Sequence, residues 1–186
     1  MKKIKKHTIE SLFNNQTEIV TWDQSYITGI ELFDSQQREI FNITNQLYNA
    51  CLDGRDQAAL VFKETMSHMV DYVRFHFSAE QEVMKKADYP DYNNHKLQHD
   101  LFIKDIITAA NEFDCGKIFT PNSFVRTLKD WIHGHIAYYD QGYAVFLADQ
   151  KSKGLYINTP PTMAELLYSP PEAGGSRGVS SVTKFM

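Results

Sequence analysis

The strongest constraint in this sequence is an apolar pattern of helical period that runs from about Phe33 to Asp149. Apolar residues recur three and four positions apart, which places them on one face of an α-helix. Gly and Pro punctuate the pattern near Gly54, Pro90 and Gly116, where helices commonly end. We therefore predict four long helices, over residues 34–52, 56–87, 93–113 and 121–150.

Short connections between these helices favour antiparallel neighbours. The predicted fold is an all-α, up-down-up-down four-helix bundle over residues 34–150. An extended N-terminal arm, residues 1–33, precedes it and carries apolar anchors at Trp22, Tyr26, Ile27 and Ile30. A tail over residues 151–186 follows, with a candidate short helix at 162–168. The composition of its Gly/Ser-rich end, after Glu172, predicts disorder.

Composition narrows the class of protein further. The chain has 186 residues and a formal net charge of −4, which suits one soluble domain and argues against a nucleic-acid partner. No apolar run is long enough to span a membrane, and residues 7–15 are too polar for a secretory signal. Cys51 and Cys115 are too few for a disulfide framework, so we expect two small core residues in a reduced, cytoplasmic protein.

Each predicted helix has an inward-facing stripe that polar residues interrupt. In chain order the stripes are Gln37, Phe41, Thr44, Tyr48 and Cys51, with Ile40 and Leu47 beside them; Phe62, Met66, Met69, Val73, His76, Glu80, Val83 and Ala87; His95, His99, Phe102, Ile106, Ala109 and Phe113; and Phe124, Leu128, Trp131, His135, Tyr138, Gly142 and Val145. His7, His68 and His133 fall off the stripes, which predicts surface positions.

The polar interruptions have the spacing of metal ligands. His76 and Glu80 are four residues apart, as are His95 and His99, so each pair lies on one helix face. A single inward histidine is more often a hydrogen-bonded core residue. Several of them with a carboxylate, on the inner faces of three helices, are costly to bury without partners. A shared metal ion would satisfy them together.

Asp140 fits this pattern less directly. It follows His135 by five residues, which is about 140° around an ideal α-helix. Either a π-bulge or a carboxylate that reaches round the helix edge could bring it to the same centre, and π-bulges often occur at functional sites.

These motifs resemble the hemerythrin family, specifically the bacterial hemerythrins. Residues 22–46 resemble the family's entry segment, W-x3-Y-x2-GI-x2-FD-x-Q followed by a helix. Residues 76–102 resemble its HF-x2-E-x3-M-x4-YP-x4-H-x3-H-x2-F core, and residues 131–140 resemble W-x3-HI-x3-D. The resemblance covers about residues 20–150 and leaves the tail, whose partner is unknown, without a counterpart.

The resemblance implies a di-iron site with an oxo or hydroxo bridge. One iron would take His95, His99 and His135, and the other would take His76 and one further histidine. Glu80 and Asp140 would bridge the two irons. In the family, O2 binds reversibly at the less-coordinated iron.

One departure from the family concerns the further histidine, which belongs to a D-x-Q-H motif. This chain has Gln37 at that position. Gln37 could offer its amide oxygen as a weak ligand, or it could form a helix capping box with Asp34. Either way, one iron loses an imidazole and is expected to be the more labile.

Three functions remain open from the sequence. The first is a di-iron protein that binds O2 or a related diatomic ligand for carriage, storage or sensing. The second is an enzyme-like di-iron site for peroxide, NO or iron oxidation, because a missing imidazole frees a coordination position. The third is a sensor module with one metal ion or none. Zinc is an alternative metal, since three histidines and a carboxylate can also hold it.

Overall fold

The computed structural model describes residues 17–155, in which four long helical segments dominate. The first is α1 (Glu31–Asp53) and the third is α4 (Tyr92–Asp114). The second segment joins α2 (Arg55–Tyr72), a π-helical stretch η3 (Val73–Phe77) and α3 (Ser78–Lys86). The fourth joins α5 (Thr120–Trp131), a π-helical stretch η4 (Ile132–Asp140) and α6 (Gln141–Ser152). Residues 1–16 and the tail beyond residue 155 lie outside the described part of the chain.

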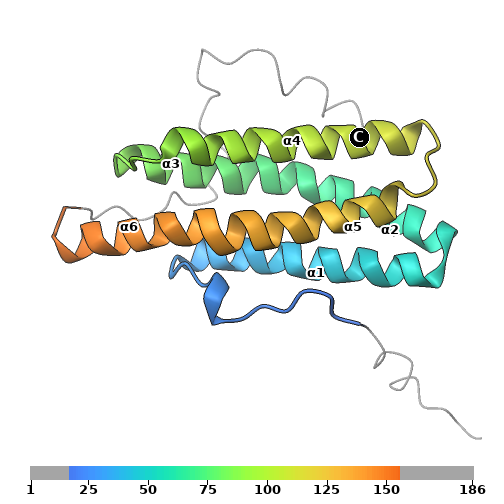
Figure 1. The fold of residues 1–186 in the computed structure, drawn as a ribbon, viewed down its shortest axis with the longest axis horizontal. Coiled ribbons are helices and arrows are strands. Elements are labelled where there is room, and N and C mark those ends of the chain that lie inside the picture. Colours follow the sequence, from blue (N-terminus) through green and yellow to red (C-terminus); the bar gives the residue numbers. More distant parts are fainter. Residues whose placement is uncertain (1–16, 156–186) are drawn as a thin grey trace, which may run out of the picture.

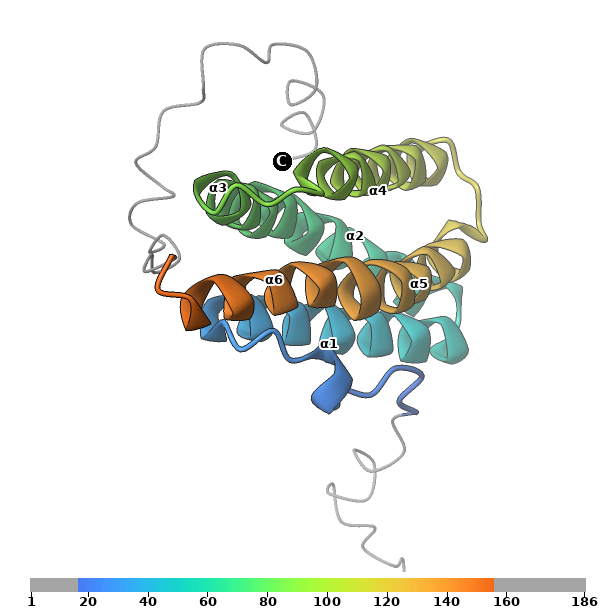
Figure 2. The same ribbon diagram turned by 60° about the vertical axis from the view of Figure 1, so that its left-hand side comes forward.

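The four segments form an antiparallel bundle, which confirms the predicted all-α fold (Figures 1 and 2). Gly54 alone separates α1 from α2 and has a φ of 118°, a conformation that residues with a side chain rarely adopt. Gly116, with a φ of 78°, follows α4. The two glycines therefore end the first and third helices where the sequence predicts.

The described part of the arm packs along α1. Asn45 on α1 accepts hydrogen bonds from the backbone N–H groups of Ile19 and Val20 and donates one to the Val20 carbonyl. The Trp22 ring packs edge-on against Phe41, with centroids 5.1 Å apart. A short 3-10 turn, η2 (Gln24–Tyr26), then leads the chain towards the start of α1.

The π-helical stretch η4 changes which residues of the fourth segment face inward. The α-helical stripe predicts that Tyr138 and Val145 are buried, and this prediction is wrong, because they are 70 % and 69 % exposed. Asp140 and Tyr143 are fully buried instead. A π-helix bonds residue i to i+5, so it inserts one residue relative to α-helical spacing and shifts the inward face.

Two clusters of buried apolar side chains fill the bundle on either side of the polar residues. Cys51 is partly buried against the larger cluster, but Cys115 is exposed, so the core prediction for Cys115 is wrong. His68 and His133 are exposed, as predicted, and His7 lies outside the described residues.

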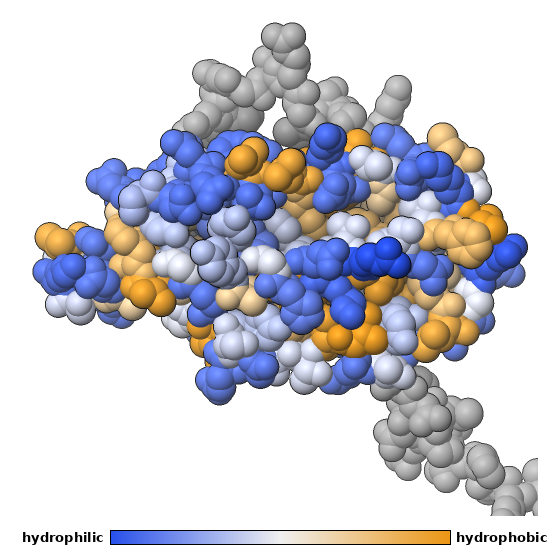
Figure 3. Space-filling model, in the orientation of Figure 1, coloured by the Kyte–Doolittle hydropathy of each residue, from blue (hydrophilic) through white to orange (hydrophobic). Residues whose placement is uncertain are grey.

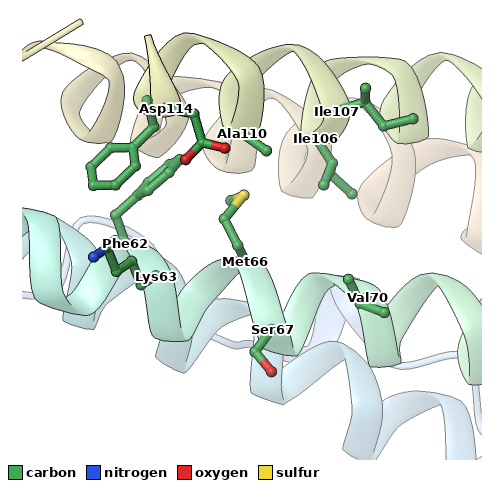
Figure 4. Close-up of a pocket in the computed structure, with 10 residues that line it drawn as sticks. Phe62, Lys63, Met66, Ser67, Val70, Ile106, Ile107, Ala110 and Asp114 are labelled. Carbon is green, nitrogen blue, oxygen red and sulfur yellow. The ribbon is translucent and has the colours of Figure 1, made fainter. Parts of the chain in front are cut away.

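The surface is mostly hydrophilic with scattered apolar side chains on the face that Figure 3 shows. A groove of about 350 Å³ opens between α2 and α4. Figure 4 shows apolar side chains from both helices along it, among them Met66, Val70, Ile106 and Ala110. Within residues 17–155, no helix is both long and apolar enough to cross a membrane.

Candidate metal centre

The structure brings six predicted site residues together in the middle of the bundle. His76 comes from η3, Glu80 from α3, the pair His95 and His99 from α4, and His135 and Asp140 from η4, of which Asp140 is the last residue. None of the six is more than 3 % exposed. Residues from three of the four helical segments thus supply six buried nitrogen and carboxylate donors.

Four of these residues form one donor group: Glu80, His95, His99 and His135. The Nε2 atom of His99 lies 3.2 Å from that of His95 and 3.1 Å from that of His135. Glu80 Oε2 lies 3.4 Å from His99 Nε2. Two ligands at about 2.1 Å from one ion and at right angles lie about 3.0 Å apart, so these separations match the edges of a coordination sphere.

A second donor group consists of His76, Glu80 and Asp140. His76 Nε2 lies 3.6 Å from Glu80 Oε2. Glu80 therefore belongs to both groups. Asp140 Oδ1 also lies 3.0 Å from His135 Nε2, so the second carboxylate likewise reaches the first group. Glu80 and Asp140 therefore both lie between the histidines of the two donor groups.

Asp140 reaches the centre through the π-helical stretch. His135 and Asp140 are five residues apart, which is the hydrogen-bonding interval of a π-helix. Of the two explanations that the sequence leaves open for Asp140, the π-bulge is the one that the structure contains.

Neighbouring side chains orient the imidazoles. Gln36 Oε1 lies 3.0 Å from His76 Nδ1, and Gln81 Nε2 lies 3.0 Å from His99 Nδ1. An amide can present either its oxygen or its nitrogen at the same place, so each glutamine can accept a hydrogen bond from the Nδ1–H group and leave Nε2 unprotonated and free for a metal.

Aromatic rings fix the same imidazoles from the side. His99 stacks on Phe77 with centroids 3.7 Å apart, and His135 stacks on Trp131 at 3.8 Å. The ring of Tyr72 lies 4.5 Å from that of His76 at an interplanar angle of 18°. These contacts hold the donor nitrogens in place before any metal arrives.

Burial controls the protonation of the imidazoles. Loss of solvent lowers the pKa of His76 to about 3 and also lowers the pKa values of His95 and His99. A neutral imidazole has a lone pair on the ring nitrogen that carries no proton. His76, His95 and His99 are therefore neutral at neutral pH, and each has a lone pair to offer to a metal ion.

The two buried carboxylates repel each other electrostatically when both are ionised. Burial, together with the charge of Asp140, raises the pKa of Glu80 well above its ordinary value. Burial acts in the same direction on Asp140, but the adjacent His135 reverses it and lowers the pKa of Asp140. Both oxygens of Glu80 and the Oδ1 atom of Asp140 are buried without a hydrogen bond. A divalent cation would satisfy these atoms and stabilise both carboxylates in their ionised form.

Gln37 is fully buried and contacts the centre through Asp140. Its Nε2 donates a hydrogen bond of 2.7 Å to Asp140 Oδ2, while its Oε1 has no hydrogen-bond partner. The capping-box alternative is wrong, because α1 begins at Glu31 and Asp34 accepts hydrogen bonds from Thr28 instead. Three residues of α1 thus precede the predicted start, and Gln37 lies one turn inside the helix, facing the interior.

Three residues around the centre were not predicted from the sequence. Gln36 precedes buried Gln37, and Gln81 follows buried Glu80. Neither lies on a predicted inward-facing stripe. Tyr72 lies four residues before His76, a spacing that places it on the same helix face. The stripe that we predicted took Val73 in its place, although Tyr72 fits the spacing of three and four between Met69 and His76 equally well.

An antiparallel four-helix bundle with a buried centre of histidines and carboxylates defines a class of metal-binding proteins. The family model of the hemerythrin HHE cation-binding domain matches residues 28–147, and this chain belongs to the hemerythrin family. That membership is consistent with the geometry of the centre and implies that the centre binds a metal, iron in this family.

Individual relatives agree. The chain is 33 % identical over 127 residues to a bacteriohemerythrin of Stenotrophomonas maltophilia, an alignment that covers 68 % of this chain and 80 % of the relative. It is 31 % identical over 124 residues to the bacteriohemerythrin of Pseudomonas aeruginosa, and this alignment covers 67 % of this chain and 78 % of the relative. It is 26 % identical over 131 residues to the bacteriohemerythrin of Methylococcus capsulatus, and this alignment covers 70 % of this chain and 98 % of the relative. The resemblance inferred from the motifs is therefore confirmed.

Proposed function

We propose that the centre holds two iron ions and reversibly binds O2 or a related small diatomic ligand. His95, His99 and His135 hold the first iron, and His76 contributes to the second. Glu80 and Asp140 bridge the two ions, together with an oxo or hydroxo group. The observation that carries this proposal is that Glu80 is shared by two buried donor groups.

The two irons differ in their donors. The first has three imidazoles and the second has one, because Gln37 occupies the position from which the family takes a further histidine. Imidazole nitrogen binds iron more strongly than a neutral amide oxygen does. The second iron is therefore the more labile one, and it has the open positions at which a small ligand can bind.

The same departure supports a second candidate function. An iron that lacks one imidazole has an additional exchangeable position, which favours turnover of peroxide, reduction of NO or oxidation of iron over reversible binding. Gln37 and its hydrogen bond to Asp140 are the observation in favour of this alternative.

Iron stoichiometry and optical spectra separate the two functions. The protein is purified under argon, its iron per chain is measured, and it is then exposed to O2 and returned to argon. Two irons per chain and an absorption band that disappears under argon support reversible binding. Two irons with sustained consumption of peroxide support the enzyme. One colourless metal ion per chain contradicts both and indicates a mononuclear site.

A further inference from the structure

Tyr72 is a buried tyrosine beside the part of the centre that has the fewest donors. It lies one turn before His76 and its ring stacks on that imidazole, with centroids 4.5 Å apart. Only 7 % of the residue is exposed. Its hydroxyl oxygen is itself buried from solvent. The hydroxyl is therefore directed towards the interior of the bundle.

The proton of this hydroxyl has no acceptor among the residues that the structure describes. Trp131 lies next to the phenol oxygen, but an indole N–H can only donate. Buried hydroxyls normally have a hydrogen-bond partner, and a tyrosine hydroxyl is protonated at neutral pH. A donor that is buried beside His76 without an acceptor is suited to a ligand that binds there reversibly.

We propose that Tyr72 donates a hydrogen bond from its hydroxyl to the small ligand that binds on the His76 side of the centre. This inference rests on the two-iron function proposed above, since it needs an open position at the second iron. Tyr72 thereby favours ligands with an exposed acceptor atom, such as small anions and polarised diatomic molecules, over ligands without one.

Azide is a suitable probe because it is a small anion with a terminal acceptor atom and an infrared stretch. The full-length, iron-loaded protein is titrated with sodium azide, and the stretch is recorded in H2O and in D2O. We expect the native band to shift in D2O. In Tyr72→Phe, we expect this shift to disappear and the dissociation constant to rise about tenfold, which is the typical effect of one hydrogen bond to a charged group.

Tyr139→Phe is the matched control. Tyr139 also packs beside a site histidine, with its ring 5.5 Å from that of His135, but it belongs to the side with three imidazoles. We expect Tyr139→Phe to behave as the native protein does. Iron content and melting temperature are compared first, so that the variants are known to be folded and equally loaded.

Several results would overturn the inference. A native band that does not move in D2O excludes the hydrogen bond whatever the variants do, so the inference is tested even if Tyr72→Phe fails to hold iron. A shift that survives in Tyr72→Phe, or that is lost in Tyr139→Phe, assigns the donor to another residue. If the native protein forms no azide adduct at all, the proposed function fails as well, and the two failures are thereby distinguished.

Discussion

Replacing Gln37 by histidine tests the difference that we propose between the two irons. In the native protein Gln37 is fully buried, and its Nε2 donates a 2.7 Å hydrogen bond to Asp140 Oδ2. The substitution removes this hydrogen bond. It places an imidazole on the inner face of α1, next to Asp140 of the second donor group. It therefore has opposite effects on the iron-free and the iron-loaded protein.

The magnitudes follow from these contacts. A buried hydrogen bond to a carboxylate contributes about 1.5–3 kcal/mol, so the free energy of unfolding of the iron-free variant should fall by about 2 kcal/mol. For a chain of this size that corresponds to a melting temperature about 4–8 °C lower. An added imidazole should tighten the second iron at least tenfold, which is about 1.4 kcal/mol or more.

The assay compares iron per chain, the rate of iron release to a chelator, and thermal unfolding with and without iron. Gln37→Leu is the control, because it removes the hydrogen bond without adding a ligand. We expect Gln37→His to hold two irons per chain and to release the second more slowly, whereas Gln37→Leu should share only the destabilisation.

Two results would refute this reasoning. If the native protein already holds two tightly bound irons and Gln37→His changes neither iron content nor release, then the second iron has an adequate ligand set without an imidazole at this position. If Gln37→Leu loses the second iron entirely, the amide itself is a ligand rather than a hydrogen-bond donor to Asp140.

Three further predictions concern the other parts of the centre and the bundle. His99→Ala should weaken the first iron at least tenfold in a chelator competition, whereas His68→Ala, an exposed position, should not change it. In the iron-free protein, the free energy of unfolding, measured by urea titration, should fall as the pH decreases below 6.5. An unfolded histidine binds a proton near pH 6.5, but folded His76 does so only near pH 3; His95 and His99 act in the same direction, and they outnumber Glu80, whose raised pKa acts in the opposite one. Gly142→Ala should raise the free energy of unfolding by about 0.5–1 kcal/mol, because alanine is favoured over glycine inside a helix. The added Cβ would lie 3.5 Å from the Tyr89 hydroxyl, an ordinary van der Waals contact. A decrease in melting temperature would show that the added methyl group clashes with its neighbours.

Much of the fold follows from local signals in the sequence. The helices end at Gly54 and Gly116 because the backbone there adopts positive φ angles that favour glycine. The start of α1 is less accessible to such reasoning. Ile30, the residue before the helix, makes no side-chain cap, and Asp34 instead bonds Thr28 in the arm. That boundary depends on how the arm packs, which a local pattern does not contain.

The site residues likewise divide into those that local spacing predicts and those that it does not. The pairs His76–Glu80 and His95–His99 are recognisable because an interval of four residues is also the interval of an α-helix face. The exposed positions of Tyr138 and Val145 are not predictable from that interval, because the π-helical stretch shifts the inward face of the fourth segment. The hydrogen bond from Gln37 to Asp140 joins residues 103 apart in the sequence and depends on the tertiary packing of α1.

The two π-helical stretches and Gln37 together explain why the centre is asymmetric. A regular helix, α4, supplies His95 and His99 at the α-helical interval and needs no distortion. The fourth segment supplies His135 and Asp140 five residues apart, and here a π-helical stretch brings them to the same face. The helix α1 has neither an inward imidazole nor a π-helical stretch, so it acts on the centre through Gln37, which donates a hydrogen bond to Asp140, and through Gln36, which lies 3.0 Å from His76 Nδ1. A change in α1 should therefore alter the positions of Asp140 and His76 and the affinity for the second iron that we propose, while the three-histidine group is left intact.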